Sequence, residues 1–295
     1  AEPYTHCTPS QTRGVPMLLE ADVNAIPGSS SVETVYNQIL SDLDNAEQYL
    51  NVEEWELGKN YRFNTTSAQA LRARTYLYMG RWSDALEASK DVLSVYNELE
   101  DMNNSTTLPN SYKSKESIVA LERFSSNLYT AVDMPASEFI SLYRSGDQRR
   151  TKYFKRVTSS TYSLLKGRSD EFSCSFRTAE FYLTAAEAAA RLGHTTDAIN
   201  YLTPLMAKRL NTSAYQTTTA LIGTMTEEEL IQEILDERAR ELAFEGHRWY
   251  DLRRTSQPAL TRVYDGTTYT LLPEQYTMRF PSEAVEANPE IERWQ

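Results

Sequence analysis

The stretch from Thr226 to Thr255 constrains the fold more than any other part of this 295-residue chain. Thr226 is a favourable helix N-cap, and Glu229 follows three residues later, so the two residues can satisfy each other's end groups as a capping box. Apolar residues then recur at helical spacing from Leu230 to Trp249. The pattern predicts one helix over residues 226–255, roughly 40 Å long at about 1.5 Å per residue.

Charged residues occupy the positions between these apolar residues, and we expect them to fill the opposite face of the helix. They recur at spacings of three and four residues, which is typical of ion pairs along a helix surface. We interpret them as groups that hold the helix against its neighbours rather than as ligand contacts. The charged positions are Glu237, Arg238, Glu241, Glu245, Arg248 and Asp251.

The amino-acid composition limits the classes of protein to which this chain can belong. Hydrophobic residues make up 40% of the chain and charged residues 24%, which is typical of a globular protein. The net charge of −11 argues against a nucleic-acid partner, because phosphate contacts need clustered Lys and Arg. Only ten glycines, together with many Ala, Leu and Glu, favour helices over a β-sandwich. No apolar run reaches the roughly 18 residues that would span a bilayer.

Signals for catalysis or metal binding are weak. Cys7 and Cys174 do not form a short metal-binding spacing, and the three histidines are scattered. The sequence leaves open whether these two cysteines form a disulfide. No phosphate-binding glycine loop or serine nucleophile elbow is present, and no carboxylate pair lies in a markedly apolar setting. We therefore predict a protein that is not an enzyme and that needs no cofactor or metal.

An internal repeat organises the helical parts of the chain. Gly80 and Ala85 reappear as Gly193 and Ala198, at a constant offset of 113 residues. Each unit reads as a helix, a short turn at glycine and a second helix, with alanine where the two helices cross closely. This is tetratricopeptide-like chemistry, in which stacked helix pairs share a core. It predicts helical hairpins over residues 66–96 and 177–210.

Residues 97–176 interrupt these hairpins and show little helical periodicity. Residues 116–124 are rich in β-branched and apolar side chains and predict a strand, and a hairpin is expected around Gly167. Long irregular insertions on a rigid frame often carry binding sites, so we predict the ligand region here. An aromatic ring can pack against the flat C–H face of a pyranose, while polar groups meet its hydroxyls. The candidate ligand-binding residues are Tyr112, Tyr129, Trp55, Asn127 and Phe124.

Eleven positions between Ile234 and Arg254 form the string I-x-x-E-R-x-x-E-L-x-x-E-G-x-R-x-x-D-L-x-R. This string resembles the signature of the SusD/RagB family of nutrient-binding surface lipoproteins. Residues 13–17 resemble the family's G-V-P-L segment, Asp147 and Arg149 its D-x-R loop, and residues 279–289 its closing P-x-x-E-x-x-x-N-P segment. The G-V-P-L segment lies well inside such proteins, so we expect the chain to begin partway through a family member.

The resemblance implies a mainly helical, all-α fold in which tetratricopeptide-like hairpins carry a long irregular insertion and minor β-structure, forming a single domain over residues 1–295. It implies binding of an oligosaccharide, or less often a peptide, and its delivery to a SusC-like TonB-dependent transporter. It also implies that the protein lies at the cell surface, attached to the outer membrane by a lipid anchor outside this chain. The alternative is a tetratricopeptide scaffold that binds only protein; a glycoside hydrolase is a more remote one.

Overall fold

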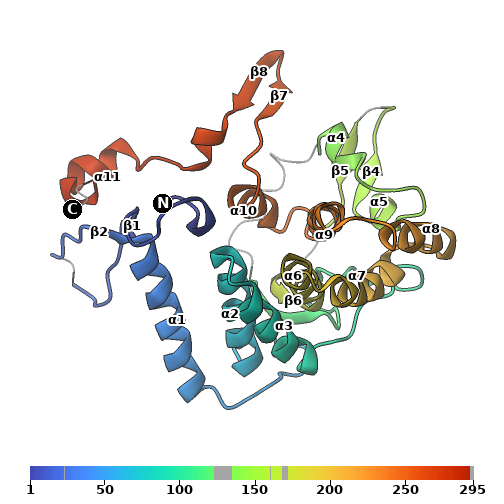
Figure 1. Cartoon of the computed structure of the whole chain (residues 1–295), viewed down its shortest axis with the longest axis horizontal. Helices are drawn as coiled ribbons and strands as arrows, with labels where there is room; N and C mark the ends of the chain where they lie inside the picture. Colours follow the sequence, from blue (N-terminus) through green and yellow to red (C-terminus); the bar gives the residue numbers. More distant parts are fainter. Residues whose placement is uncertain (23, 123–134, 160, 168–171, 293–295) are drawn as a thin grey trace. The chain divides into compact units, whose positions relative to one another are not determined.

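The computed structural model describes residues 1–295 except 23, 123–134, 160, 168–171 and 293–295 (Figure 1). The described residues are mainly helical, and their β-structure consists of two-stranded antiparallel sheets. The predicted all-α fold with minor β-structure is therefore confirmed. Among the helices of the described residues, none is both long enough and apolar enough to cross a membrane.

The chain divides into two compact units, which are described separately. The larger unit contains residues 46–77 and 81–248, and the smaller one contains residues 1–45, 78–80 and 249–295. Three of the boundaries between the units fall within helices, namely α1 (Val32–Tyr49), α2 (Thr65–Met79) and α10 (His247–Arg254), and the fourth follows Gly80 in the turn after α2. The single domain predicted from the sequence stays a prediction.

A layer of helices forms the frame of the larger unit. Its central helix, α6, packs against α3, α7 and α9 (Figure 1). A run of alanines from Ala185 to Ala190, interrupted only by Glu187, is completely buried in α6, so the neighbouring helices can approach closely. The helices of the frame are α2 (Thr65–Met79), α3 (Trp82–Val95), α6 (Thr178–Arg191), α7 (Thr195–Arg209), α8 (Thr212–Ile222) and α9 (Glu227–Glu241).

The two units of the internal repeat correspond to the helix pairs α2–α3 and α6–α7. Gly80 and Gly193 adopt φ values of +70° and +75°, a left-handed conformation that favours glycine after a helix. Ala85 and Ala198, the predicted crossing residues, are both 0% exposed.

The helix predicted over residues 226–255 is instead two helices, so the prediction of one continuous element is wrong. The capping box of Thr226 and Glu229 is present at the start of α9, but α9 ends at Glu241 and α10 spans His247–Arg254. In the turn between them, Phe244 and Gly246 have φ values of +60° and +87°. The break is stabilised from elsewhere in the chain, because side chains of two distant residues bind the backbone oxygen of Glu241, as described below.

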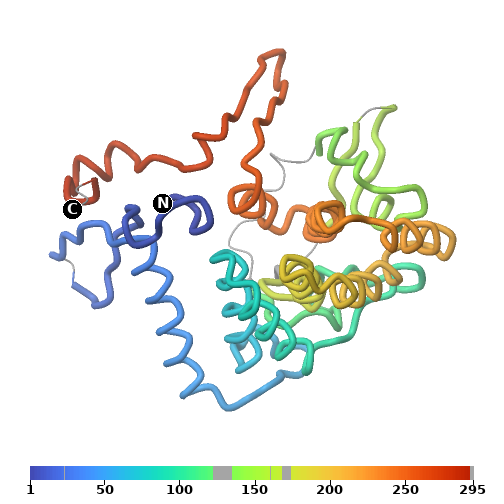
Figure 2. The backbone as a smooth tube through the Cα atoms, in the orientation of Figure 1, coloured from blue at the N-terminus to red at the C-terminus, as the bar shows by residue number. Residues whose placement is uncertain are grey.

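The described residues of the insertion between α3 and α6 form more regular elements than the sequence predicts, and Figure 2 traces them in green and yellow. The predicted strand is present as β3, which pairs with β6, while β4 pairs with β5. The hairpin expected around Gly167 is therefore wrong, since β5 and β6 belong to different sheets. The elements of the insertion are β3 (Ser117–Glu122), α4 (Ser137–Ile140), α5 (Arg149–Lys152), β4 (Phe154–Arg156), β5 (Tyr162–Leu164) and β6 (Phe172–Arg177).

A small core of its own stabilises the middle of this insertion. Tyr143, Tyr153 and Phe154 are 3% exposed or less and pack with Met102, Ile140 and Leu164. The rings meet edge to face, with centroids of Tyr143 and Phe154 5.4 Å apart, which is a favourable arrangement for aromatic pairs. This core holds β4 and β5 in place.

The smaller unit contains most of the 18-residue helix α1, together with short elements. Its strands form two antiparallel pairs, β1 with β2 and β7 with β8. The elements not given above are η1 (Tyr4–His6), β1 (Arg13–Pro16), β2 (Ser29–Ser31), α1 (Val32–Tyr49), β7 (Leu260–Tyr264), β8 (Thr267–Leu271), η3 (Pro273–Tyr276), α11 (Ser282–Ala287) and η4 (Pro289–Ile291).

Candidate functional site

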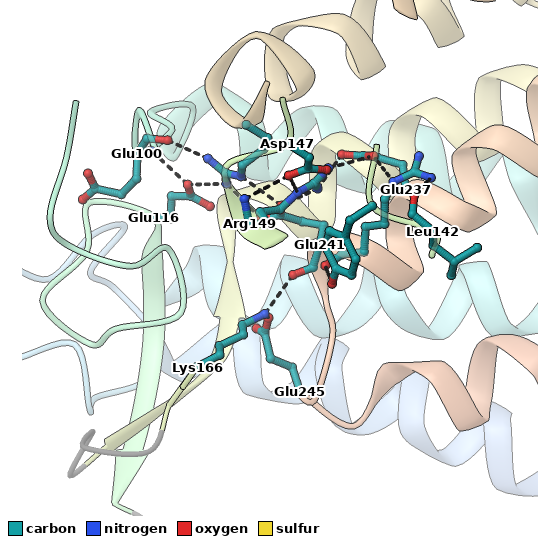
Figure 3. Close-up of polar contacts among 12 residues, drawn as sticks. Glu100, Glu116, Leu142, Asp147, Arg149, Lys166, Glu237, Glu241 and Glu245 are labelled. Carbon is teal, nitrogen blue, oxygen red and sulfur yellow. Dashed lines mark hydrogen bonds and ion pairs between the residues drawn. The ribbon is translucent and has the colours of Figure 1, made fainter. Parts of the chain in front are cut away.

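The charged residues of α9 lie in the interior of the larger unit. Glu237 and Glu241 are 1% and 0% exposed, and both accept hydrogen bonds from the completely buried Arg149 of α5. The Arg149 Nη1–Glu237 Oε1 distance is 2.6 Å (Figure 3). The expectation that these charges fill a separate outer face is therefore wrong, because arginines from distant segments neutralise them inside the protein.

Glu241 is the centre of this buried ion network. Its carboxylate accepts from Arg149, Arg177 and Arg209 at 2.6–2.9 Å. Burial by itself would raise the pKa of Glu241, but the guanidinium groups of Arg209 and Arg177 lower it well below its usual range. The carboxylate therefore stays ionised and fixes three arginines from three different elements.

Glu116, immediately before β3, links the network to this part of the insertion. It accepts from Arg209 Nη2 at 2.7 Å and Arg177 Nη1 at 3.2 Å, and from the backbone N–H of Glu100 at 2.8 Å. Burial raises the pKa of Glu116 above its ordinary value, while the two arginines oppose that rise.

The end of α9 is held by the same network. Lys166 Nζ and Arg177 Nη2 both donate to the Glu241 backbone oxygen, at 2.9 and 2.8 Å, where a continuous helix would have used its own N–H groups. Glu245 accepts from the same two side chains at 2.5–2.8 Å. Burial tends to raise the pKa of Glu245, but Arg177 and Lys166 lower it to about 2, and burial lowers the pKa of Lys166 to about 8.

The network confirms that the charged motif of α9 positions helices. It joins α5, β6, α7 and α9 to Glu116, the residue before β3, and the D-x-R pair belongs to it, since Asp147 accepts from Arg149 at 2.8–3.0 Å. Its carboxylates are engaged by guanidinium or ammonium groups, so they are poorly suited to donate or accept a proton from a substrate. Side chains at the surface are therefore better candidates for ligand contacts than the buried network.

A loop over residues 51–64, between α1 and α2, carries exposed aromatic rings. Tyr61 and Phe63 are 51% and 59% exposed, and the indole N–H of Trp55 donates to the backbone oxygen of Phe63 at 3.1 Å. The Arg62 guanidinium lies over the rings of Trp55 and Tyr61, 5.2 and 5.5 Å from their centroids. The arginine therefore holds the two rings through cation–π contacts.

Tyr112 of the insertion joins this loop. Asn60 donates from Nδ2 to the Tyr112 backbone oxygen and to Ser117 Oγ, both at 2.9 Å, and accepts from the N–H of Ala120 at 2.9 Å. Tyr61, Tyr112 and Asn60 line a small cavity of about 50 Å³. We call Trp55, Tyr61, Phe63 and Tyr112 the aromatic loop surface.

The base of the loop is anchored to the helical frame. Asn64 is completely buried; its Oδ1 accepts from the N–H of Ser67, and its Nδ2 donates to the Tyr96 hydroxyl at 3.3 Å. Burial raises the pKa of Tyr96 to about 12. The Thr66 hydroxyl also donates to the Glu53 backbone oxygen at 2.8 Å. The rings above are thus presented by a loop with fixed ends.

Of the candidate ligand residues, Trp55 and Tyr112 lie in this region, whereas Phe124, Asn127 and Tyr129 lie outside the described residues. Phe63 is the aromatic residue that the sequence reasoning missed. A usable signal was the density of rings beside Arg62 in a loop that starts and ends at asparagines. Whether any of these side chains contacts a ligand stays a prediction.

Metal and disulfide chemistry find no support in the described part of the chain. No group of three or more His, Cys, Asp or Glu side chains there could hold a metal ion. Cys7 and Cys174 are free cysteines, and burial raises the pKa of Cys174 to about 12, so its thiol is protonated at neutral pH.

The chain is similar to known proteins both in sequence and in fold. The sequence matches the model of the SusD family over residues 55–285, whereas no protein of curated function matches it. A SusD superfamily protein from Bacteroides fragilis has a TM-score of 0.81 at 23% identity, covering 99% of this chain and 72% of its own. One from Bacteroides thetaiotaomicron has a TM-score of 0.80 at 22% identity, with the same coverage. Surface glycan-binding protein A from Bacteroides uniformis has a TM-score of 0.72 at 17% identity, covering 96% and 73%.

Proposed function

This chain belongs to the SusD family, and from that premise we propose that it is a cell-surface nutrient-binding protein whose ligand is an oligosaccharide. The observation that supports the ligand class is the aromatic loop surface. Exposed rings held by Arg62 and Asn60 can pack on the C–H faces of sugar rings, and neighbouring polar groups can meet sugar hydroxyls.

Binding at this surface needs no pKa-tuned acid and no metal. The loop is fixed at both ends, so little conformational entropy is lost when a ligand orders it. The carboxylates of the buried ion network are committed to arginines, so they are poor proton donors or acceptors for a substrate. We therefore propose that the protein holds its ligand without breaking bonds in it.

The remaining steps of nutrient uptake belong to the same proposal. The bound oligosaccharide would be passed to a SusC-like TonB-dependent transporter, with the protein attached to the outer membrane by a lipid anchor. Two relatives are consistent with a carbohydrate ligand, since one is described as a SusD-like carbohydrate binding protein and another as a surface glycan-binding protein.

A second candidate function is a scaffold that binds only protein. The two hairpins, α2–α3 and α6–α7, favour it, because such hairpins build interaction surfaces in tetratricopeptide proteins. The exposed rings outside these hairpins favour the sugar-binding function.

A glycan array followed by titration calorimetry tests the proposal. We expect at least one neutral or acidic oligosaccharide to bind, and we expect its length to be unchanged after prolonged incubation with the protein. Absence of binding to every glycan on the array would reject a sugar ligand and favour the scaffold, and shortened products would reject the purely binding role.

A further inference from the structure

An arginine-lined cavity of about 470 Å³ adjoins both the ion network and the insertion's small core, because Asp147 of the network and Phe154 of the core line it. Its walls come from the loop before α5, from α5 itself and from the β4–β5 pair. We call it the arginine cavity, after Arg144, Arg150 and Arg156, which line it together with Tyr162 and Phe154. Binding pockets for small ligands typically occupy about 300–1,000 Å³, so its size fits one or two sugar rings.

The cations of this cavity are not equivalent. Arg144 is already paired with Glu233, at 2.5 Å. Arg150 and Arg156 are exposed, and among the described residues neither contacts a carboxylate: Arg150 Nη2 donates to the Tyr162 hydroxyl at 3.4 Å, and Arg156 donates to the backbone oxygens of Thr158 and Ser159. Asp147 also lines the cavity, but its carboxylate is buried and paired with Arg149 at 2.8 Å. In a chain of net charge −11, two exposed guanidinium groups that have no carboxylate partner among the described residues therefore form a local site for an anion.

The β4–β5 pairing brings these groups together. Arg156 of β4 lies directly opposite Tyr162 of β5, and the hydroxyl of Tyr162 is the acceptor for Arg150. Tyr162 therefore contacts Arg150 through its hydroxyl and pairs with Arg156 across the sheet, and Phe154 forms part of the wall. Guanidinium groups bind carboxylates and sulfates through paired N–H donors, whereas an aromatic ring favours an apolar face. The combination suits a ligand that has both an anionic group and an apolar face.

A second cavity of about 340 Å³ shares Arg144, Ser145 and Gly146 with the first. Its other walls present the hydroxyls of Ser213 and Thr217 on α8, which can meet the hydroxyls of an uncharged sugar. Gly146, with φ of +86°, allows this junction, because a Cβ there would lie 2.8 Å from the Ala214 Cβ. The two cavities together would accept a short chain.

We propose that the arginine cavity binds the acidic residue of an anionic oligosaccharide, with its carboxylate or sulfate held by Arg150 and Arg156 and its ring against Tyr162. The adjoining cavity takes the next sugar. This inference rests on the proposed carbohydrate function but uses residues separate from the aromatic loop surface.

The test is titration calorimetry of the whole chain with three probes: trigalacturonate, a sulfated galactose oligosaccharide and uncharged galactotriose. We expect one of the two acidic probes to bind at least about tenfold more tightly than galactotriose and to weaken as salt is raised, since salt screens exposed charges. The acidic probe that binds identifies whether carboxylate or sulfate is the recognised group.

The decisive variant is the double substitution Arg150→Gln/Arg156→Gln. It should abolish the preference for the acidic probe, whereas Arg150→Lys/Arg156→Lys should keep part of it, because lysine retains the charge without the paired donors. Lys155→Gln is the matched control: Lys155 is an exposed cation on β4, next to Arg156, and does not line the cavity. Lys155→Gln should leave the preference for the acidic probe unchanged, and all variants should have the same melting temperature as the parent.

Equal binding of acidic and neutral probes would overturn this inference, and so would a preference that survives in the double glutamine variant. In both cases the proposed function would stand, because a sugar still binds. If no carbohydrate binds the parent on the array or in these titrations, the proposed function fails, and this inference fails with it.

Discussion

The buried ion network and the aromatic loop surface contrast in where their residues come from and in how they are exposed. The network gathers charged side chains from α5, β6, α7, α9 and the segments between elements into the interior, and Glu241, Arg149 and Arg209 are 0% exposed. The loop surface presents rings from one loop and Tyr112, and Tyr61 is 51% exposed. The strongest motif of the sequence thus belongs to the frame, whereas the candidate binding surface lies where no motif marks it.

This difference has an energetic basis. Charges placed in an interior lose their hydration, and only close partners compensate for that loss, so each member requires the others. Because each charged residue depends on the others, few residue types are allowed at each position. The fixed residue types form a motif that can be recognised in the sequence. A ring on a fixed loop contributes its contact area nearly independently of its neighbours, and ring types and positions can vary with the ligand.

The largest effect is expected when the network loses its central carboxylate. Glu241→Ala leaves Arg149, Arg177 and Arg209 without their shared partner, and removing one member of a buried ion pair costs about 3–5 kcal/mol. Urea unfolding measures the change in the free energy of unfolding. Glu87→Ala, at an exposed position of α3, is the control and should change it by about 0.5 kcal/mol or less. Equal effects of the two substitutions would contradict the central role of Glu241.

Acid should weaken the same network. The pKa of Glu245 is about 2 in the folded protein against an ordinary 4.5, so the unfolded chain binds more protons between these values. The stabilisation is complete above about pH 4.5 and is lost as the pH falls toward about 2; for Glu245 it is on the order of 3 kcal/mol. The lowered pKa values of Glu237 and Glu241 act in the same direction, and the raised pKa of Glu116 opposes them.

Unfolding free energies at about pH 6 and about pH 3 measure this dependence. Glu245→Gln removes one titrating group, so its stability should change less between the two pH values than that of the parent. An identical pH dependence in parent and variant would show that Glu245 does not carry the effect.

A smaller loss is expected at the helix crossings of the frame. Ala198→Leu and Ala85→Leu insert three additional carbons where both side chains are 0% exposed, and overpacking costs about 1–3 kcal/mol. The matched control is Ala220→Leu on the exposed side of α8, which should stay within about 0.5 kcal/mol of the parent. Thermal melts compare the variants, and an unchanged melting temperature in Ala198→Leu would be evidence against a tight crossing there.

The smallest stability effect, with a selective effect on binding, is expected at the aromatic loop surface. Tyr61→Ala and Tyr112→Ala should each weaken oligosaccharide binding by on the order of 1 kcal/mol, because each removes one stacking surface. Calorimetry with a glycan that binds the parent measures the loss. Tyr264→Ala, at a 75% exposed tyrosine of β7, should leave the affinity unchanged. Unchanged affinity in Tyr61→Ala, Tyr112→Ala and Trp55→Ala together would exclude this surface as the binding site.

Features that depend on neighbours along the chain were determined by the sequence itself. The capping box of Thr226 and Glu229, the glycine turns at Gly80 and Gly193 and the buried alanines of the hairpins all follow from local geometry. A helix period or a left-handed turn involves residues a few positions apart, so its signal is readable in the sequence. The helical frame and the strand β3 were predictable for this reason.

Only the tertiary structure decided that the charges of α9 are buried and that the helix ends at Glu241. The partners of Glu241 are 32, 64 and 92 residues away, and no local pattern states which charge will find which partner. A periodic helix pattern continues through residues 242–246, but side chains of Lys166 and Arg177 bind the Glu241 oxygen and stabilise a break there. The same reason applies to Tyr112, which lines a cavity with Tyr61 and is held there by Asn60, 52 residues before it, because long-range hydrogen bonds bring together residues that the sequence keeps apart.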